Sequence, residues 1–449
     1  MARRCETKPQ RNQINARNQL NARNQRPSQL DLPVRDHKAA IIVGVAISSD
    51  NLKQIEDDLT ELEALLVTLG VEPKARIVQR RQKFTPQCLL GTGKAEEIGV
   101  LAKLHGATMV VVDQILSPPQ VRNLEQLTGC AVTDRSGVIL EIFAKHARST
   151  QAKTQVEIAR LQYLLPRMAG AWTHLERQTG GGVNSKGMGE TQIEVDRRRA
   201  RDKIARLQRT LEQIRKEKQI QRKARRNELK VALVGYTNTG KSTVMNAMTR
   251  SDMLTKDALF ATLESSVRTI NPISRPRILM SDTVGFIRKL PHGLVESFRS
   301  TLDEVLEADL LLHMVDASHP NYKEQMVATQ LVLEEIGAAD LPQMIVFNKF
   351  DRIDDPFLPR ILKHAYKGSI CISAQSPEDL VRLREHIHEF FTRHMITARV
   401  AIQHTDQDAM SLVYNNCLIL DSDFETAGQA IFHIQTTQSS LALLRPYLR

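Results

Sequence analysis

A glycine-rich turn between an apolar run and a helical pattern constrains the fold of this chain more than any other feature. Residues 230–235 (KVALVG) predict a buried strand that leads directly into residues 235–243 (GYTNTGKST). This spacing matches GxxxxGK[ST], in which the glycines let main-chain N–H groups wrap phosphates. Lys241 is then placed to reach the outer phosphates, and the Ser242 hydroxyl is placed to ligate Mg²⁺. The sequence therefore predicts a P-loop α/β domain.

Three short segments follow this loop in an order that a guanine-nucleotide site requires. An apolar strand ends at Asp282, which can hold Mg²⁺ through water, and the N–H of Gly285 can meet a γ-phosphate. Residues 348–351 (NKFD) end another apolar run, and the Asp351 carboxylate can accept from both N1–H and the 2-amino group of guanine. Adenine offers neither donor there. Residues 373–375 (SAQ) are placed to back the base with main-chain N–H groups.

A threonine between these segments is the candidate switch residue. Thr262 lies in residues 259–264 (LFATLE), where it can complete the Mg²⁺ shell and sense the γ-phosphate, although spacing alone also fits an ordinary loop threonine. We predict Lys241, Thr262 and Gly285 as catalytic, and Ser242, Thr262 and, through water, Asp282 as Mg²⁺ ligands. The full predicted GTP-binding set is Gly235, Tyr236, Thr237, Asn238, Thr239, Gly240, Lys241, Ser242, Thr243, Phe260, Ala261, Thr262, Leu263, Glu264, Asp282, Thr283, Val284, Gly285, Asn348, Lys349, Phe350, Asp351, Ser373, Ala374 and Gln375.

The residue after Gly285 departs from a common pattern. Many GTPases place a glutamine there to orient the attacking water, but this chain has Phe286. A phenylalanine side chain cannot hydrogen-bond water. We therefore expect slow hydrolysis by the isolated protein and faster hydrolysis once a partner reshapes the site.

Changes of pattern predict five parts. Residues 1–37 carry an RNQ repeat with few apolar residues and predict a disordered basic tail. Residues 38–144 alternate strand and helix, and residues 145–228 predict two antiparallel helices joined by a glycine-rich tip within residues 178–190, which we expect not to be helical. Residues 229–394 form the P-loop domain and residues 395–449 a small α+β domain. The expected fold class is α/β, with the helical hairpin as an insertion between two α/β domains.

Positive charge is concentrated in two of these parts. The net charge is +11, and residues 146–230 alone hold 21 basic against nine acidic residues. Such a hairpin with a thin glycine-rich tip favours RNA binding, with Lys186, Arg197, Arg198 and Arg199 as the predicted contacts. A solvated helix face is the alternative. The tail has eight basic and three acidic residues and fits either a nonspecific nucleic-acid arm or a plain extension.

Composition excludes several classes. The longest apolar run, residues 39–47, is too short for a bilayer that needs about 20 residues, and the N-terminus lacks a secretory pattern, so we expect a cytoplasmic protein. The five cysteines are scattered without a CxxC pair, which disfavours disulfides and zinc. We also expect a monomer.

Residues 91–94 (GTGK) and the apolar run before Asp113 mimic a second nucleotide site, but the first glycine and the Ser/Thr after Lys94 are missing. We favour a structural turn over a second site. The histidines, among them His292 and His313, show no spacing typical of metal ligands.

With these motifs the chain resembles the bacterial HflX family of translational GTPases over roughly residues 38–449. The segments that carry the resemblance include GTGKAEEI, LSPPQVRNLE, DRSGVILEIFAKHAR, GMGETQIEVDRRR, GYTNTGKST, LFATLE, DTVGFIRKLPHGLVESFRSTLDEV, ADLLLHMVDAS and NKFD. The resemblance implies binding to the large (50S) ribosomal subunit, a hairpin tip that enters rRNA near the peptidyl-transferase centre, and splitting of stalled ribosomes. Thr239, Met188 and Glu264 depart from the family pattern, and Met188 lies within the predicted tip.

Two function classes follow. The first is a Mg²⁺-dependent GTPase that acts on the 50S subunit in ribosome splitting, rescue, recycling or biogenesis, with GTP/GDP and rRNA as partners. The second is a regulatory GTPase with a protein partner, in which the basic hairpin is a docking coiled coil. No membrane span is predicted in either case, and peripheral membrane association is left open.

Overall fold

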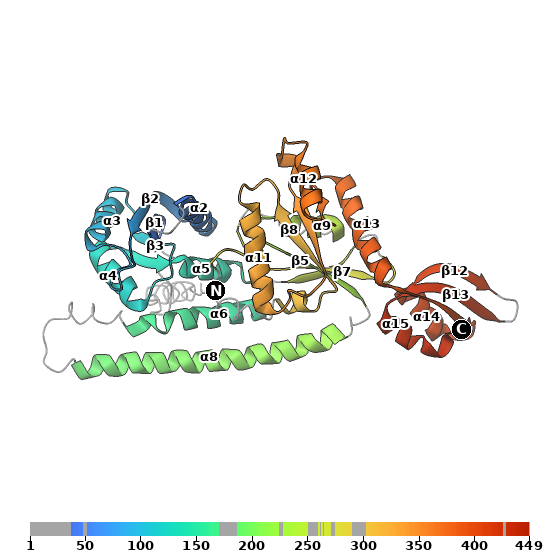
Figure 1. Cartoon of the computed structure of the whole chain (residues 1–449). Helices are drawn as coiled ribbons and strands as arrows, with labels where there is room; N and C mark the ends of the chain where they lie inside the picture. The colour runs from blue at the N-terminus through green and yellow to red at the C-terminus, as the bar shows by residue number, and fades with distance from the viewer. Residues whose placement is uncertain are drawn as a thin grey trace, which may run out of the picture. The chain divides into compact units, whose positions relative to one another are not determined.

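The computed structural model describes residues 37–47, 52–169, 186–223, 228–249, 259–260, 262–263, 265–270, 274–289, 302–424 and 428–448. These residues form sheets of four, six and three strands, with two helices of an inserted segment between the first two sheets in chain order (Figure 1). The chain divides into unit 1 (Met1–Leu59, Val71–Gly137 and Arg160–Ala200) and unit 2 (Thr60–Gly70, Val138–Ala159 and Arg201–Arg449). The predicted α/β fold class is confirmed. The predicted tail lies outside the described residues except for its last position.

The first sheet is parallel throughout, with the strand order β2-β1-β3-β4. Its two central strands are apolar and buried, whereas the edge strand β2 is charged and largely exposed. Side chains of α3 and α4 pack with those of β1 and β3 into one core. In chain order the elements are β1 (Ala39–Ile47), α2 (Leu52–Leu69), β2 (Glu72–Arg81), α3 (Thr92–Leu104), β3 (Met109–Val112), α4 (Pro118–Thr128), β4 (Ala131–Asp134) and α5 (Arg135–His146).

Buried ion pairs and hydrogen bonds form at the carboxyl ends of β3 and β4. Arg135 Nη1 lies 2.9 Å from Asp113 Oδ1, and both side chains are almost fully buried. Asp134 accepts from the Tyr163 hydroxyl at 2.9 Å and from Arg167 Nη2 at 3.0 Å. Because a buried charge is costly unless paired, these contacts fix the geometry of this sheet edge.

The inserted segment contains α6 (Thr150–Leu164), a 3₁₀ turn η2 (Arg167–Ala169) and the 38-residue helix α8 (Lys186–Lys223). Lys203 Nζ lies 2.5 Å from Glu157 Oε1, which places α6 and α8 side by side (Figure 1). Residues 170–185, with most of the predicted tip, lie outside the described residues. The expectation that residues 186–190 are not helical is wrong, because α8 begins at Lys186 and includes Gly187 and Gly189. Each glycine costs a helix about 1 kcal/mol, and the length of α8 outweighs that cost.

The second sheet has the order β10-β9-β8-β5-β7-β6, and only the edge strand β6 is antiparallel to its neighbour. Separate apolar clusters cover its two faces. The elements are β5 (Leu229–Gly235), α9 (Lys241–Thr249), β6 (Ser266–Thr269), β7 (Ile278–Asp282), β8 (Leu310–Asp316), α11 (Tyr322–Ile336), β9 (Gln343–Asn348), η3 (Phe350–Arg352), α12 (Leu358–Ala365), β10 (Ile370–Cys371) and α13 (Pro377–His394). His313 is buried on β8, where desolvation and the nearby Lys241 lower its pKa to about 4.

The last sheet is antiparallel with the order β11-β13-β12, and its core includes Val400, Val413 and Phe432. It comprises β11 (Ile396–Gln403), α14 (Gln407–Asn416), β12 (Leu418–Phe424), β13 (Gln429–Thr436), α15 (Gln438–Leu443) and η4 (Arg445–Tyr447). Among the described residues of the whole chain, no helix has the length and apolarity that a membrane span requires.

Candidate nucleotide site

The predicted P-loop connects the carboxyl end of β5 to the first turn of α9. Gly235 has φ 145°, and a Cβ there would lie 2.3 Å from the Met314 carbonyl oxygen, so only glycine fits at this approach. Gly240 has φ 89° and would meet the Asn348 amide in the same way. The chain therefore turns sharply into a helix N-terminus, where main-chain N–H groups favour anions.

Lys241 is buried against the loop that precedes it. Its Nζ donates to the carbonyls of Gly235 at 3.1 Å and Tyr236 at 2.6 Å. Desolvation lowers the pKa of Lys241 to about 8, although the nearby Asp282 carboxylate opposes that shift. An incoming phosphate would add negative charge beside this group and favour its protonated form.

Three side chains with oxygen atoms, those of Ser242, Thr262 and Asp282, meet next to Lys241. Ser242 Oγ lies 2.7 Å from Thr262 Oγ1 and donates to Asp282 Oδ2 at 2.6 Å, while Thr262 Oγ1 lies 3.0 Å from the same carboxylate oxygen. Burial raises the pKa of Asp282, and the hydrogen bonds from Ser242 and Thr262 oppose that rise. Asp282 Oδ1 is buried and has no hydrogen-bond partner among the described residues. A carboxylate and two hydroxyls are the hard donors that Mg²⁺ prefers.

The segment after Asp282 packs directly on the P-loop. A Cβ on Gly285 would lie 2.9 Å from Thr237 Cα and 3.1 Å from Lys241 Nζ, so a larger residue would displace the loop. Phe286 N–H donates to the Gly235 carbonyl at 3.1 Å, and Thr237 N–H donates to the Phe286 carbonyl at 2.8 Å. The Phe286 side chain is buried in the apolar core with Val234. Position 286 therefore anchors the backbone and presents no polar side-chain group to the site.

The predicted base-binding segments are tied together at the same sheet edge. Asn348 Nδ2 donates to the Thr239 carbonyl at 2.9 Å, and its Oδ1 accepts from Ala374 N–H at 3.0 Å. Asp351 is exposed, and its Oδ1 accepts from the Ser373 hydroxyl at 2.6 Å. The N–H of Gln375 donates to the Ser373 hydroxyl. These bonds join the P-loop to residues 348–351 and 373–375, and the Ser373 hydroxyl holds the exposed Asp351 carboxylate.

Two carboxylates at this edge of the sheet were not predicted from the sequence. Asp316, at the end of β8, lies 2.8 Å from Lys349 Nζ, and Asp379, in the first turn of α13, accepts from the N–H of Ser373 at 2.7 Å. Asp316 ends an apolar strand as Asp282 does, so its position was a usable signal. No comparable signal marks Asp379, because its role depends on how α13 follows the loop.

The remaining predicted residues fall into three groups. Tyr236, Thr237, Thr239, Phe260, Leu263, Thr283 and Val284 are buried around the site, and Asn238, Thr243 and Phe350 lie on its segments. Ala261 and Glu264 lie outside the described residues. On α8, Arg197 is half-buried and Arg198 and Arg199 are exposed, while the Lys186 side chain is outside the described set.

The GTGK segment forms the start of α3. Gly91 N–H donates to Gln79 Oε1 at 3.1 Å, and Lys94 Nζ contacts both carboxylate oxygens of Glu97 within 2.9 Å. Lys94 thus pairs with a residue of its own helix.

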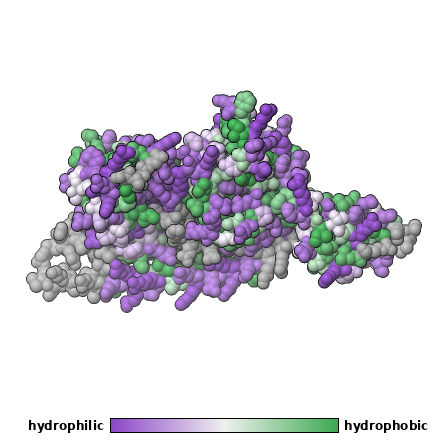
Figure 2. Space-filling view, viewed as in Figure 1, coloured by the Kyte–Doolittle hydropathy of each residue, from purple (hydrophilic) through white to green (hydrophobic). Residues whose placement is uncertain are grey.

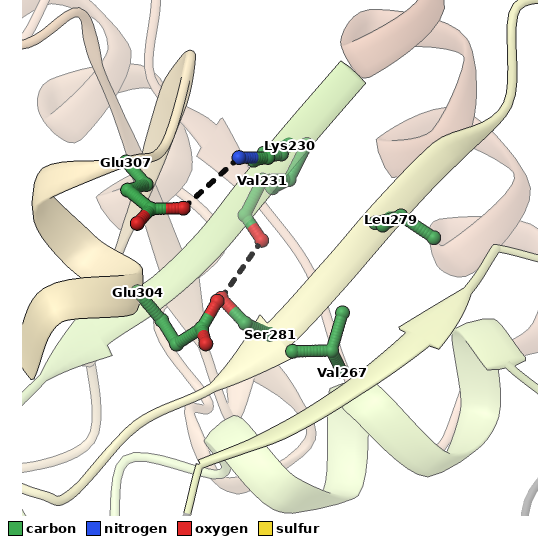
Figure 3. A pocket seen from close by; sticks show the side chains of 7 residues that line it. All are labelled: Lys230, Val231, Val267, Leu279, Ser281, Glu304 and Glu307. Carbon is green, nitrogen blue, oxygen red and sulfur yellow. Dashed lines mark hydrogen bonds and ion pairs between the residues drawn. The ribbon is translucent and has the colours of Figure 1, made fainter. Parts of the chain in front are cut away.

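A pocket elsewhere on the second sheet is separate from this site. It is lined by residues of β5, β6 and β7 and by two glutamates, namely Lys230, Val231, Val267, Leu279, Ser281, Glu304 and Glu307 (Figure 3). Lys230 Nζ closes one side by its contact with Glu307 at 3.1 Å. Because the P-loop follows the opposite end of β5, this pocket takes no part in the nucleotide site.

A mainly parallel sheet with a P-loop, a cluster of serine, threonine and aspartate oxygens, and an NKFD loop at one edge defines a P-loop GTPase. Residues 56–144 match the family described as "GTP-binding GTPase N-terminal", residues 146–225 "GTP-binding GTPase Middle Region" and residues 230–349 "50S ribosome-binding GTPase". The chain is 39% identical over 430 residues to the GTPase HflX of Gluconacetobacter diazotrophicus, covering 87% of this chain and 94% of that protein. It is 44% identical over 354 residues to the GTPase HflX of Escherichia coli, covering 78% and 82%. The chain belongs to the HflX family and is a GTP hydrolase.

Among solved structures, the chain is similar to a GTP-binding protein from Sulfolobus solfataricus in complex with GDP. The identity is 25% and the TM-score 0.41, with 79% of this chain and 99% of that chain covered.

Proposed function

We propose that this GTPase binds Mg²⁺·GTP at the P-loop edge and acts on the large ribosomal subunit through its basic helix α8. The observation that carries the ribosomal part is the set of exposed arginine and lysine side chains on α8, among them Arg198, Arg201 and Arg206. The part of α8 that is visible in Figure 2 is mostly hydrophilic. The Arg199 and Lys216 side chains are each 72% exposed. The match of residues 230–349 to the "50S ribosome-binding GTPase" family supports this proposal.

The proposed Mg²⁺ site uses the hydroxyls of Ser242 and Thr262 directly and the Asp282 carboxylate through water. The buried, unsatisfied Asp282 Oδ1 and the convergence of the three side chains fit a hard cation. When bound, Mg²⁺ would neutralise charge on the phosphate oxygens. The Lys241 ammonium supports the outer phosphates, and Gly285 N–H supports the γ-phosphate.

In the proposed base site, Asp351 recognises guanine by hydrogen bonds. Its carboxylate accepts from N1–H and the 2-amino group, while Ser373 holds the carboxylate in place by the 2.6 Å hydrogen bond. Asn348 and Lys349 position the loop through Thr239 and Asp316.

Hydrolysis by the isolated protein is proposed to be slow, because the buried Phe286 cannot orient water. In single-turnover assays, purified large subunits should raise the hydrolysis rate at least tenfold, which corresponds to about 1.4 kcal/mol in the barrier. Small subunits at equal concentration serve as the control. Fast hydrolysis by the isolated protein, unchanged by large subunits, would contradict this proposal.

The hairpin is proposed to bind rRNA phosphates and to support splitting of ribosomes. The variant Arg197→Ala/Arg198→Ala/Arg199→Ala should weaken co-sedimentation with large subunits and lower the slope of log affinity against log salt by about two to three, since each arginine neutralises about one phosphate. GTP affinity should stay within about twofold, because these residues lie on α8 and not at the P-loop. The assay uses a nonhydrolysable GTP analogue and sucrose-cushion sedimentation across a salt series.

The matched control removes the same charge elsewhere, from the exposed Arg360, Arg393 and Arg445. Equal loss in both triple variants would indicate a general charge effect. Unchanged ribosome binding by the α8 variant would favour the docking coiled-coil alternative, in which the hairpin binds a protein. Sedimentation after nuclease digestion separates RNA from protein contacts.

A further inference from the structure

Tyr236, in the P-loop, contacts a helix outside the second sheet. Its side chain is 3% exposed, and its hydroxyl donates to Glu61 Oε1 on α2. The same hydroxyl accepts from the main-chain N–H of Arg288 at 2.8 Å. One phenol group therefore joins α2 to the segment that follows Gly285.

The main chain of Tyr236 adds two further contacts. Its carbonyl accepts from Lys241 Nζ at 2.6 Å, and its backbone forms a parallel bridge with Phe286. Tyr236 thus contacts Lys241 and two residues that follow Gly285, Phe286 and Arg288. A shift of the Tyr236 side chain would disturb its hydrogen bonds to Glu61 and to the main chain of Arg288.

Phe260 makes a second, independent connection two residues before Thr262. Its ring packs edge-on against Phe143 of α5, with ring centroids 4.7 Å apart and an interplanar angle of 77°. Its carbonyl accepts from His146 Nδ1 at 2.8 Å. Phe260 is 2% exposed, and its φ of 57° lies in the left-handed region that few residues other than glycine adopt.

The two helices that receive these contacts are joined to each other. Lys145 Nζ on α5 donates to the carbonyls of Thr68 at 3.2 Å and Leu69 at 3.0 Å, at the end of α2. Residues Thr60–Gly70 and Val138–Ala159 belong to the same compact unit as the second sheet. The α2–α5 pair therefore touches the Gly285 side of the site through Glu61 and the Thr262 side through Phe143 and His146.

We propose that Tyr236 and Phe260 are positioning residues for GTP hydrolysis, which the α2–α5 pair holds in place through Glu61, Phe143 and His146. This inference rests on the proposed roles of Thr262 and Gly285. Both of these residues contact the γ-phosphate side of the site, so the α2–α5 pair sets the rate of hydrolysis and has little influence on GDP affinity. Any partner that moves the pair changes that rate without touching the nucleotide.

The test breaks the Tyr236–Glu61 hydrogen bond from either side and measures the hydrolysis rate separately from nucleotide affinity. Tyr236→Phe deletes only the hydroxyl, and Glu61→Ala deletes its acceptor. Each should lower the single-turnover hydrolysis rate by roughly five- to twentyfold, since small misplacements of reacting groups are costly. The Kd for GDP, measured with a fluorescent analogue, should stay within about twofold and report that the variant is folded.

A conservative variant and a double variant distinguish a positioning role from a general destabilisation of the protein. Glu61→Gln keeps an oxygen acceptor and should retain a rate near that of the unmodified protein, as should the control Gln54→Ala on the same helix. The double variant Tyr236→Phe/Glu61→Ala should be no slower than Tyr236→Phe alone, because that change already removes the Tyr236–Glu61 hydrogen bond. Phe143→Leu should lower the hydrolysis rate by weakening the contact with Phe260. In the double variant with Tyr236→Phe, the two rate losses should add.

Unchanged rates in Tyr236→Phe and Glu61→Ala would overturn the inference, as would rate losses that simply add. Thr262→Ala is measured alongside. If it is inactive while the contact variants are normal, the inference alone fails. If Thr262→Ala also hydrolyses GTP normally, the proposed roles of the site residues fail with it.

Discussion

The substitution Asp351→Asn is expected to lower GTP affinity by about two to three orders of magnitude and to create affinity for xanthosine triphosphate. Guanine donates two hydrogen bonds to the carboxylate, and hydrogen bonds to a charged group contribute about 1.5–3 kcal/mol each. Losing about 3–4 kcal/mol corresponds to this change in Kd. Xanthine has a carbonyl in place of the 2-amino group, and that carbonyl can accept from the asparagine amide.

Competition against a fluorescent guanine nucleotide measures both effects. The nearby Asp354 is also exposed, so Asp354→Asn removes the same charge without touching the proposed base contact. It should leave the preference for GTP over XTP unchanged. An Asp351→Asn protein that still prefers GTP would place base recognition elsewhere, and Ser373, whose hydroxyl contacts Asp351, would be the first residue to test.

Elements with strong apolar patterns could be predicted from the sequence. The apolar run of residues 39–47 forms β1. The helix α2 ends just before Gly70, whose φ of 86° ends a helix. The edge strand β2 (EPKARIVQRR) was missed, since only one of its ten residues is buried and charge hides the pattern. An edge strand is stabilised by its ladder to β1, which a single sequence does not display.

The candidate site likewise has some parts that could be predicted from the sequence and others that could not. Residues 235–243, 282–285 and 348–351 follow strand ends, and parallel strands bring their carboxyl ends to one edge, so their convergence could be expected. The contacts of Glu61, Phe143 and Asp379 could not be foreseen. Each depends on how a helix packs on a distant loop, and neither periodicity nor spacing encodes that pairing. Gly187 and Gly189 locally disfavour a helix, but both lie within α8, because the long helix outweighs their preference.

Thr262→Ala and Ser242→Ala are expected to separate the catalytic from the binding contribution of the oxygen cluster. Thr262→Ala should lower single-turnover hydrolysis by about 10²–10³-fold, the loss typical of one preorganised transition-state contact, with GDP affinity within about twofold. Ser242 lies at the start of α9, within the P-loop. Ser242→Ala should weaken both GTP and GDP, and it should remove most of the difference between Mg²⁺ and EDTA buffers.

The geometry explains why the two variants differ. Ser242 contacts both Thr262 and Asp282, so its loss opens the whole cluster, whereas Thr262 reaches the cluster from a separate segment. Thr269→Ala on β6 is the control, because its side chain lies outside the cluster on a neighbouring strand. Stopped-flow nucleotide binding with and without Mg²⁺, followed by single-turnover hydrolysis, measures both quantities on the same samples. Equal loss of GDP affinity in both variants would assign Thr262 to ground-state binding and remove it from the proposed switch.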